Sequence, residues 1–266
     1  MLKPRKKSSH KGDNGNVVII GGSEDYIGAP TLVGMAALAT LRSGADLVTV
    51  IAPEKVAWAI NCIAPDIITK KIPCKNFLQK NVKQVLQLTK NADVVEIGNG
   101  IAFTSGAKKF MQQVIKKIKK PMVIDAAALR VIRIQDVRNS VLLPHAKEYE
   151  VLLKNSRLKG NVQKYLGNNI LVKKGHPVTA IISKNKIAYN KTGNAGMTHG
   201  GTGDVLAGIV SALIAQGNDA FMSAYAAVYV NGKAAELLYK KMGFGYLASD
   251  LIQVIPQVLR KFQKQI

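Results

Sequence analysis

Apolar and polar positions along the first half of the chain predict strands that alternate with helices. Apolar runs that end in glycine, proline or aspartate, such as residues 16–22 and 46–53, are typical of buried strands. Between these two runs, residues 28–44 have the small and apolar spacing of a helix that packs closely on a sheet. The same alternation predicts strands at 66–69, 93–97, 121–125 and 141–143, a helix beginning at residue 54, and helices at 77–89 and 104–119. This order favours a largely parallel sheet with right-handed crossovers.

The second half of the chain has a different pattern. After two short helices, three closely spaced apolar runs at 169–175, 179–183 and 186–190 predict strands joined by turns, with a hairpin that caps the parallel sheet. Long helices are then predicted at 202–216, 220–241 and 249–262, with alanine and glycine on their packing faces. We expect residues 14–266 to form a single domain, and residues 1–13 to form a mobile basic tail.

Composition excludes several classes of protein. Hydrophobic residues make up 47% of the 266 residues, which is enough for a continuous core. Apolar stretches stay short of the roughly 20 residues that cross a bilayer, and the basic N-terminus lacks the apolar segment of a secretory signal. We therefore expect a cytoplasmic protein without a membrane partner. Cys62 and Cys74 suit neither a disulfide framework nor a metal site.

The charge of the chain is strongly basic. Thirty-eight Lys and Arg residues against sixteen Asp and Glu residues give a formal net charge of +22. The basic residues fall in short clusters without interleaved aromatic residues or a nucleic-acid-binding motif. A solvated basic surface is therefore the favoured interpretation, followed by attraction of anionic small substrates and, last, nucleic-acid binding.

The most informative segment is TGNAGMTHGGTGD at residues 192–204. Its glycines crowd the approach to a helix, so backbone N–H groups can reach a bound anion, and the helix N-terminus favours negative charge. Asp204 falls at the start of that helix, where a carboxylate could take a proton from a hydroxyl that attacks phosphorus. Taken singly, the same residues also suit a tight turn and a helix cap.

The joint pattern GGTGD, which opens a helix of small residues, resembles the ribokinase-like superfamily. With the preceding TGNAGM it resembles, more narrowly, the NAD(P)H-hydrate dehydratase family. The resemblance spans roughly residues 14–260 and includes GGSEDYIGAP at 21–30, EIGNGI at 96–101, VIDAAAL at 123–129, LPHAKEYEVL at 143–152 and KKGHPV at 173–178. It implies a ribokinase-like α/β fold of three layers, with a mostly parallel central sheet and helices on both faces.

The resemblance also implies roles for particular residues. Asp204 corresponds to the family's catalytic base. The residues that resemble the family's anion hole are Gly200, Gly201, Thr202 and Gly203. Those that resemble its site for the nicotinamide substrate are Ala29, Gly100, His145 and Asp204. Those that resemble its nucleotide site are Lys174, Gly175, His176, Pro177, Val178 and Gly203.

The implied activity is repair of the 6-hydroxy hydrates of NADH and NADPH. In this reaction the hydroxyl is phosphorylated by ADP or ATP, and elimination of phosphate then restores NAD(P)H. Mg²⁺ is expected to bridge the nucleotide phosphates, but no protein ligand can be assigned to it. The resemblance further implies a homotetramer and a functional pairing with a separate epimerase of the hydrates.

Some residues depart from the family pattern or leave two interpretations open. Asn99 and Ala195 stand where the family usually has proline. Asp125 could position a base or a metal-bound water, or it could cap the next helix. His199 could donate to a phosphate or be solvated. His145, three residues before Glu148, suits both substrate contact and a helix cap. His10 lies in the predicted tail and is assigned no role.

Two rival functions follow from the same residues. A ribokinase-like kinase of hydroxyethylthiazole or hydroxymethylpyrimidine would keep Asp204 and stop at the phosphate ester. A basic protein that binds nucleic acid and has lost catalysis would account for the net charge. The HExxH, GxSxG, Walker and GxGxxG patterns are absent from the sequence, so it supports neither zinc or serine hydrolysis nor a P-loop or Rossmann site.

Overall fold

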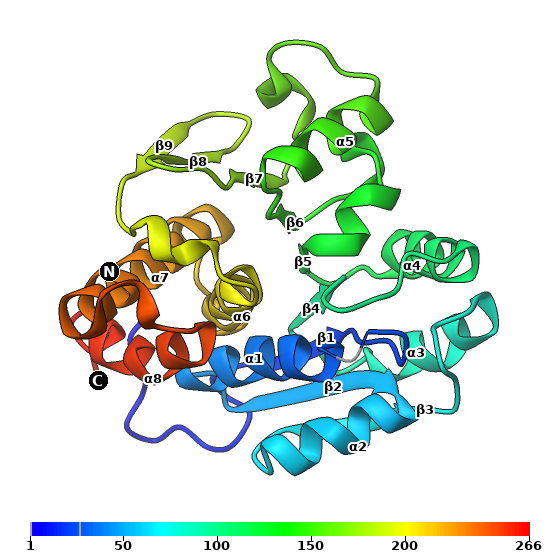
Figure 1. Ribbon diagram of the computed structural model, residues 1–266, viewed down its shortest axis with the longest axis horizontal. Helices are drawn as coiled ribbons and strands as arrows, with labels where there is room; N and C mark the ends of the chain where they lie inside the picture. Colours follow the sequence, from blue (N-terminus) through cyan, green and yellow to red (C-terminus); the bar gives the residue numbers. More distant parts are fainter. Residues whose placement is uncertain (1, 27) are drawn as a thin grey trace.

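A single sheet of nine strands organises the computed structural model, which describes residues 2–26 and 28–266 (Figure 1). Its strands are β1 (Asn16–Ile20), β2 (Leu47–Pro53), β3 (Ile68–Ile72), β4 (Val94–Ile97), β5 (Met122–Ile124), β6 (Ser140–Leu142), β7 (Ile170–Lys173), β8 (Thr179–Ile182) and β9 (Ile187–Asn190). Their order is β3-β2-β1-β4-β5-β6-β7-β8-β9. Pairing is parallel from β3 through β7 and antiparallel from β7 to β9. The predicted parallel sheet with a capping hairpin is confirmed.

The strand order reverses direction at β1. The chain moves outward from β1 to β2 and β3, and then returns to the other side of β1 with β4. The loops that follow β1 and β4 therefore leave the sheet in opposite directions, which is where open α/β sheets form ligand crevices. The two loops also touch, because the backbone N–H of Gly22 donates to the carbonyl of Asn99 at 2.9 Å.

Helices cover both faces of the sheet. One face carries α1 (Ala29–Arg42), α2 (Glu54–Ile63), α6 (Thr202–Ala215), α7 (Ala220–Met242) and α8 (Ala248–Leu259), and the other carries α3 (Val82–Leu88), α4 (Ser105–Lys117) and α5 (Ala146–Ser156). Within β1, Val17 and Ile19 belong to the first core, and Val18 and Ile20 to the second. This alternation is the period of two that a strand buried on both faces requires. The predicted three-layer α/β fold is confirmed.

Small residues bring α6 close to α1. A Cβ atom added at Gly208 would lie 2.2 Å from the carbonyl oxygen of Ala36, so no larger residue fits there. The hydroxyl of Thr40 donates to the carbonyls of both Ala36 and Gly208, at 2.8 and 3.1 Å. The alanine and glycine content of the predicted helix at 202–216 thus has a packing cause, and this packing fixes the N-terminus of α6.

The structure corrects some predicted boundaries. The helix predicted at 77–89 begins instead with a loop and a 3-10 turn at Gln79–Asn81, and α3 follows from Val82. The Asn81 side chain accepts a hydrogen bond from the Leu78 N–H at 2.9 Å, while Phe77 stacks on Phe110 in the core. These contacts hold Phe77 and Leu78 outside the helix. Several 3-10 helices were not predicted, among them Ala126–Val131 and Ile134–Asp136.

The N-terminal segment lies along the C-terminal one. The backbone N–H groups of Arg5 and Lys7 donate to the carbonyls of Lys264 and Ile266, and Arg5 pairs with Asp46 at 2.5 Å. The predicted mobility of residues 1–13 and the domain boundary after them stay predictions. None of the helices within the described ranges is long and apolar enough to cross a membrane.

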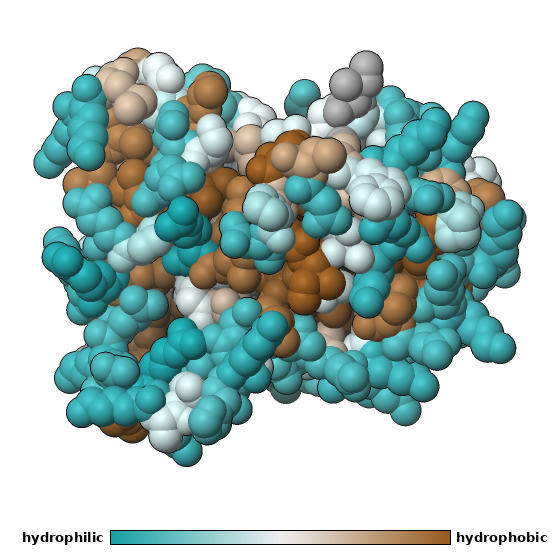
Figure 2. Space-filling model, turned by 90° about the horizontal axis from the view of Figure 1, so that it is seen from below, coloured by the Kyte–Doolittle hydropathy of each residue, from teal (hydrophilic) through white to brown (hydrophobic). Residues whose placement is uncertain are grey.

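Hydrophobic residues also reach the surface. Large exposed examples are Trp58, Ile63 and Ile68, of which Trp58 is 56% exposed. Figure 2 shows hydrophobic residues in a band across the middle of one face, bordered by hydrophilic residues. A homo-oligomer would be expected to cover surface of this kind. The tetramer implied by the family resemblance stays a prediction.

Candidate active site

Asp204 lies in the first turn of α6, behind a loop whose shape depends on glycine. Gly201 precedes the helix with a φ of +94°, and a Cβ atom there would lie 2.8 Å from the Met35 sulfur and 3.0 Å from the Ala248 Cβ. The Thr202 hydroxyl donates to the carbonyls of Met197 and His199 at 2.8 and 3.1 Å, which closes the loop. The first N–H groups of α6 have no carbonyl partner within the helix, so they suit an anion.

The environment of Asp204 raises its pKa to about 6. Burial is the main cause, and the nearby Asp125 carboxylate adds to it. Three contacts lower this pKa: the Asn99 amide, which donates to Oδ1 of Asp204 at 2.7 Å, the positive charge of Lys174, and the backbone N–H of Asp204 itself. A carboxyl with a pKa near 6 is ionised at neutral pH and still basic enough to accept a proton.

Asp125 and Lys174 form a partly buried ion pair next to the anion loop. Asp125 is 3% exposed, and its Oδ1 accepts from the Lys174 ammonium at 2.9 Å and from the Ala126 N–H at 2.8 Å. A Cβ atom at Gly203 would lie 3.4 Å from Lys174 Nζ and 3.8 Å from Asp125 Oδ2. Asp125 therefore caps the following 3-10 helix and also holds a cation beside the loop.

Glu96 is a third carboxyl in this region and was not among the predicted site residues. It lies on β4, is fully buried, and accepts from the Ser211 hydroxyl at 2.6 Å. Burial raises the pKa of Glu96 to about 8, with further contributions from Asp204 and Asp125. A single acidic residue within the apolar strand VVEI was the available signal.

A cavity of about 380 Å³ joins the anion loop to the segment after β7. Seven of the predicted site residues line it, namely His145, Lys174, Gly175, His176, Pro177, Thr202 and Gly203. The structure thus brings together five of the six predicted nucleotide residues and part of the predicted anion hole. The lining does not include Gly100, Val178, Gly200, Gly201 or Asp204, as far as the described residues show. The side chain of Ala29 lies outside the described residues.

His145 begins α5 with a reciprocal cap. Its backbone N–H donates to the Glu148 carboxylate at 3.0 Å, and its Nδ1 accepts from the Glu148 N–H at 3.4 Å. Burial, followed by the charge of Lys174, lowers the pKa of His145. Burial and Asp125 raise the pKa of Glu148 to about 7. The capping role is therefore present, and the substrate contact of His145 stays a prediction.

His199 packs edge-on against Tyr246, with ring centroids 6.1 Å apart, and its Nδ1 is buried without a partner among the described residues. Ala195 begins a 3-10 helix, Ala195–Thr198, that the preceding Asn194 caps. The Asn194 oxygen accepts from the Gly196 N–H at 2.9 Å and from the Tyr246 hydroxyl at 2.7 Å. This network holds the loop in place with alanine at position 195, and a phosphate contact of His199 stays a prediction.

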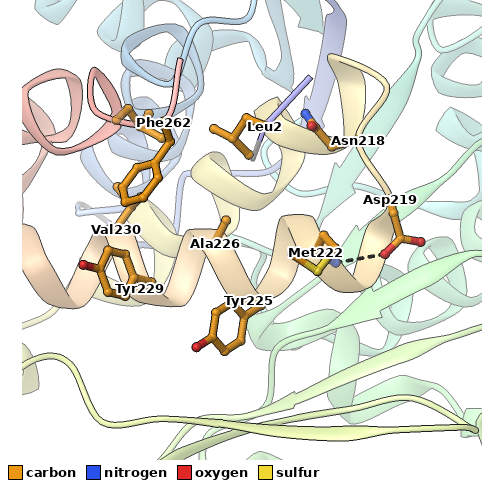
Figure 3. A pocket seen from close by; sticks show the side chains of 10 residues that line it. Leu2, Asn218, Asp219, Met222, Tyr225, Ala226, Tyr229, Val230 and Phe262 are labelled. Atoms are coloured by element: carbon orange, nitrogen blue, oxygen red, sulfur yellow. Dashed lines mark hydrogen bonds between the residues drawn. The ribbon is translucent and has the colours of Figure 1, made fainter. Parts of the chain in front are cut away.

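A second cavity, of about 520 Å³, lies between α7, α8 and the N-terminal segment (Figure 3). Its lining includes Leu2, Met222, Tyr225, Tyr229 and Phe262. The carboxylate of Asp219, at its edge, accepts from the Met222 N–H at 3.0 Å and so caps α7. This cavity lacks the carboxyl cluster and the glycine loop, so the candidate active site is the one at α6.

Within the part of the chain that the structure describes, no group of three or more His, Cys, Asp or Glu side chains could hold a metal ion. The two cysteines are unpaired.

The sequence of the chain is similar to a known family and to several of its members. Residues 17–257 match the family model described as NAD(P)H-hydrate dehydratase. The chain is 38% identical over 265 residues to the bifunctional NAD(P)H-hydrate repair enzyme Nnr of Methanocaldococcus jannaschii, covering 98% of this chain and 51% of the relative. It is 33% identical to the ADP-dependent (S)-NAD(P)H-hydrate dehydratase of Nitrosopumilus maritimus, covering 99% and 94% of the two chains.

A solved structure extends the similarity to the fold. The ADP/ATP-dependent NAD(P)H-hydrate dehydratase from Bacillus subtilis, co-crystallised with ATP/Mg²⁺, has a TM-score of 0.80 and 25% identity. The match covers 98% of this chain and 95% of the Bacillus chain. The expected ribokinase-like architecture is confirmed.

Proposed function

The chain belongs to the NAD(P)H-hydrate dehydratase family, and from this membership we propose that it dehydrates the (6S)-hydrates of NADH and NADPH with ADP or ATP as phosphoryl donor. The chain spans about half the length of several curated relatives that it matches, among them the Methanocaldococcus protein. The observation that carries the proposal is Asp204, a part-buried carboxylate in the first turn of α6, directly behind the glycine loop.

In the proposed first step, the C6 hydroxyl oxygen of the hydrate attacks the terminal phosphorus of ADP or ATP. Asp204 accepts the hydroxyl proton as the new O–P bond forms and the bond to the AMP or ADP leaving group breaks. The N–H groups around Gly200, Gly201, Thr202 and Gly203 stabilise the charge on the moving phosphoryl group. The products of this step are a phosphate ester and AMP or ADP.

In the second step, the lone pair of the ring nitrogen expels phosphate from C6, and loss of a proton from C5 restores the ring double bond. The hydroxyl has by then become phosphate, a far better leaving group. The net products are NAD(P)H, phosphate, and AMP or ADP. The chemistry after phosphoryl transfer is therefore driven by the substrate, and the protein is needed mainly to position it and to move the first proton.

The nucleotide is proposed to occupy the 380 Å³ cavity that Lys174, Gly175, His176 and Pro177 line from one side and Gly203 from the other. Gly175 allows the tight loop, because a Cβ atom there would lie 2.8 Å from the Val178 carbonyl oxygen. Mg²⁺ would neutralise charge on the nucleotide phosphates when bound, and we assign it no protein ligand.

The decisive experiment adds purified protein and Mg²⁺ to prepared NADH hydrate with ADP, with ATP, or without nucleotide. A rise in the near-ultraviolet absorbance of the dihydropyridine ring that depends on nucleotide supports the dehydratase and identifies its donor. If folded protein gives no rise with either nucleotide, the dehydratase proposal fails. Accumulation of a stable phosphate ester from a thiazole or pyrimidine alcohol would then favour the rival kinase.

Replacing Lys174 with methionine should raise the KM for the nucleotide about tenfold, because a charge-assisted contact near the phosphates is lost. The matched control is Lys173→Met. Lys173 is the preceding residue, but its ammonium is exposed and lies over the Tyr149 ring at 4.8 Å. Steady-state kinetics with varied nucleotide should separate the two variants. If Lys174→Met and Lys173→Met have the same KM for the nucleotide, Lys174 does not contact the nucleotide.

The wider setting of the activity is also a proposal. The family resemblance suggests a cytoplasmic homotetramer that works with a separate epimerase of the hydrates. The Methanocaldococcus relative is a bifunctional NAD(P)H-hydrate repair enzyme, so more than one repair function is joined in that protein. The mass of the protein in solution tests the tetramer directly.

A further inference from the structure

Asn99 occupies the place where the loops after β1 and β4 meet. It is fully buried, and its carbonyl accepts from the Gly22 N–H at 2.9 Å. A Cβ atom added at Gly21 would lie 2.5 Å from that same carbonyl oxygen. The two loops are therefore in close contact, which leaves the Asn99 side chain little freedom to move.

The Asn99 amide points its nitrogen at the proposed base. Its Nδ2 donates to Oδ1 of Asp204 at 2.7 Å, across 105 positions of sequence. The amide orientation follows from chemistry, because an ionised carboxylate only accepts hydrogen bonds, and a flipped amide would set two acceptors against each other. The Asn99 Oδ1 is buried without a partner among the described residues. The side chain thus leaves its own oxygen unpaired while its nitrogen stays on Asp204.

We propose that Asn99 is a positioning residue that holds Asp204 ionised and in a fixed orientation, so that the other carboxylate oxygen, Oδ2, receives the proton from the substrate hydroxyl. This inference rests on the proposed function for the identity of the substrate. Asn99 itself touches no reacting atom and acts through Asp204. The hydrogen bond from its amide offsets part of the desolvation free energy of the ionised Asp204 carboxylate.

Charged groups on several elements also face Asp204. Asp125, at the end of β5, raises the pKa of Asp204, and Lys174, after β7, lowers it. Glu96, on β4, has a pKa raised to about 8, so it is mostly uncharged at neutral pH. Of these neighbours, Asn99 is the one with a side-chain hydrogen bond to the Asp204 carboxylate among the described residues.

The direction of the pH effect follows from this contact. A base works in its ionised form, so kcat/KM falls as pH drops through the pKa of Asp204. Removing a donor to the ionised carboxylate raises that pKa. In Asn99→Leu the acidic limb of the profile should move upward by about 1 pH unit. In Asn99→Asp, a second carboxylate against Oδ1 should move it further upward.

The matched control is Asn81→Leu, which removes a buried asparagine whose side chain accepts from the backbone N–H of Leu78 and has no hydrogen bond to a carboxylate among the described residues. Its acidic limb should coincide with that of the wild type. At high pH, where Asp204 is ionised in every variant, the Asn99 variants should lose kcat with little change in KM. A merely structural role would not order the variants by pKa.

A second readout does not depend on turnover. Titration of the Asp204 carboxyl carbon by ¹³C NMR, assigned with Asp204→Asn, should give the pKa order wild type, Asn99→Leu, Asn99→Asp. Folded variants with an unchanged Asp204 pKa would overturn the proposal. If the wild type regenerates no NADH, the proposed function fails, while the carboxyl titration still reports on the Asn99 contact.

Discussion

Asp204→Asn is expected to reduce kcat roughly 1000-fold while the protein stays folded. Asparagine has nearly the same shape, but its amide cannot take a proton from the attacking hydroxyl, and general-base catalysis contributes about 10²–10⁴-fold. The change also removes a carboxyl group whose pKa is raised by burial and by Asp125. Because a raised pKa means that the ionised carboxylate destabilises the folded state at neutral pH, the free energy of unfolding should not fall. NADH regeneration and phosphate release measure the loss, and circular dichroism and urea unfolding measure the fold.

The variant Asp250→Asn is the control that distinguishes a catalytic base at Asp204 from a helix cap. Asp250 holds the same position in the first turn of α8 that Asp204 holds in α6, and it accepts from the Leu247 N–H at 2.7 Å. If Asp204 only favoured its helix N-terminus, the two variants would behave alike, with small changes in stability and full turnover. Nearly full activity in a folded Asp204→Asn protein would rule out Asp204 as the base.

The layers of the fold could be predicted because their signal is local. β1 and β4 are each apolar at all positions but one, and glycine marks the turns after them, so strand and loop are visible within ten residues of sequence. The prediction of a helix over residues 77–89 was wrong at its start because the deciding contact is not local. Whether Phe77 continues a helix or enters the core depends on Phe110, which is far away in sequence and stacks on it. Local pattern cannot decide between the two.

The candidate site divides in the same way. The glycine loop and Asp204 are contiguous in sequence, so their joint pattern was enough to predict an anion-binding loop with a base beside it. The environment of Asp204 is built from distant segments: the Asn99 amide, and the Asp125 carboxylate with its Lys174 partner. Glu96 depends on Ser211, which follows 115 positions later. Nothing in the sequence near Asn99 indicates that a departure from the family's usual proline places an amide on the base.

Gly98→Ala should reduce the free energy of unfolding by about 3 kcal/mol or more and kcat/KM by about 100-fold. Gly98 follows β4 with a φ of +127°, which disfavours any other residue. An added Cβ would also lie 1.9 Å from the Asp125 carbonyl oxygen and 2.9 Å from the Ala128 Cβ. Because the closest of these contacts is backbone, the end of β5 must shift, and Asp125 and its ion pair with Lys174 shift with it.

Gly160→Ala distinguishes the clash from the backbone strain. Gly160 has a comparable positive φ of +81°, but a Cβ atom there would meet nothing within 4 Å. It should therefore cost only the strain of the left-handed backbone, about 1 kcal/mol, and leave turnover intact. Urea unfolding and kcat/KM, measured on both variants, give the comparison. Equal losses in the two proteins would mean that the loop after β4 absorbs the methyl group. A larger loss of both stability and turnover in Gly98→Ala means that the close contact between the ends of β4 and β5 is what holds Asp125 in place beside the base.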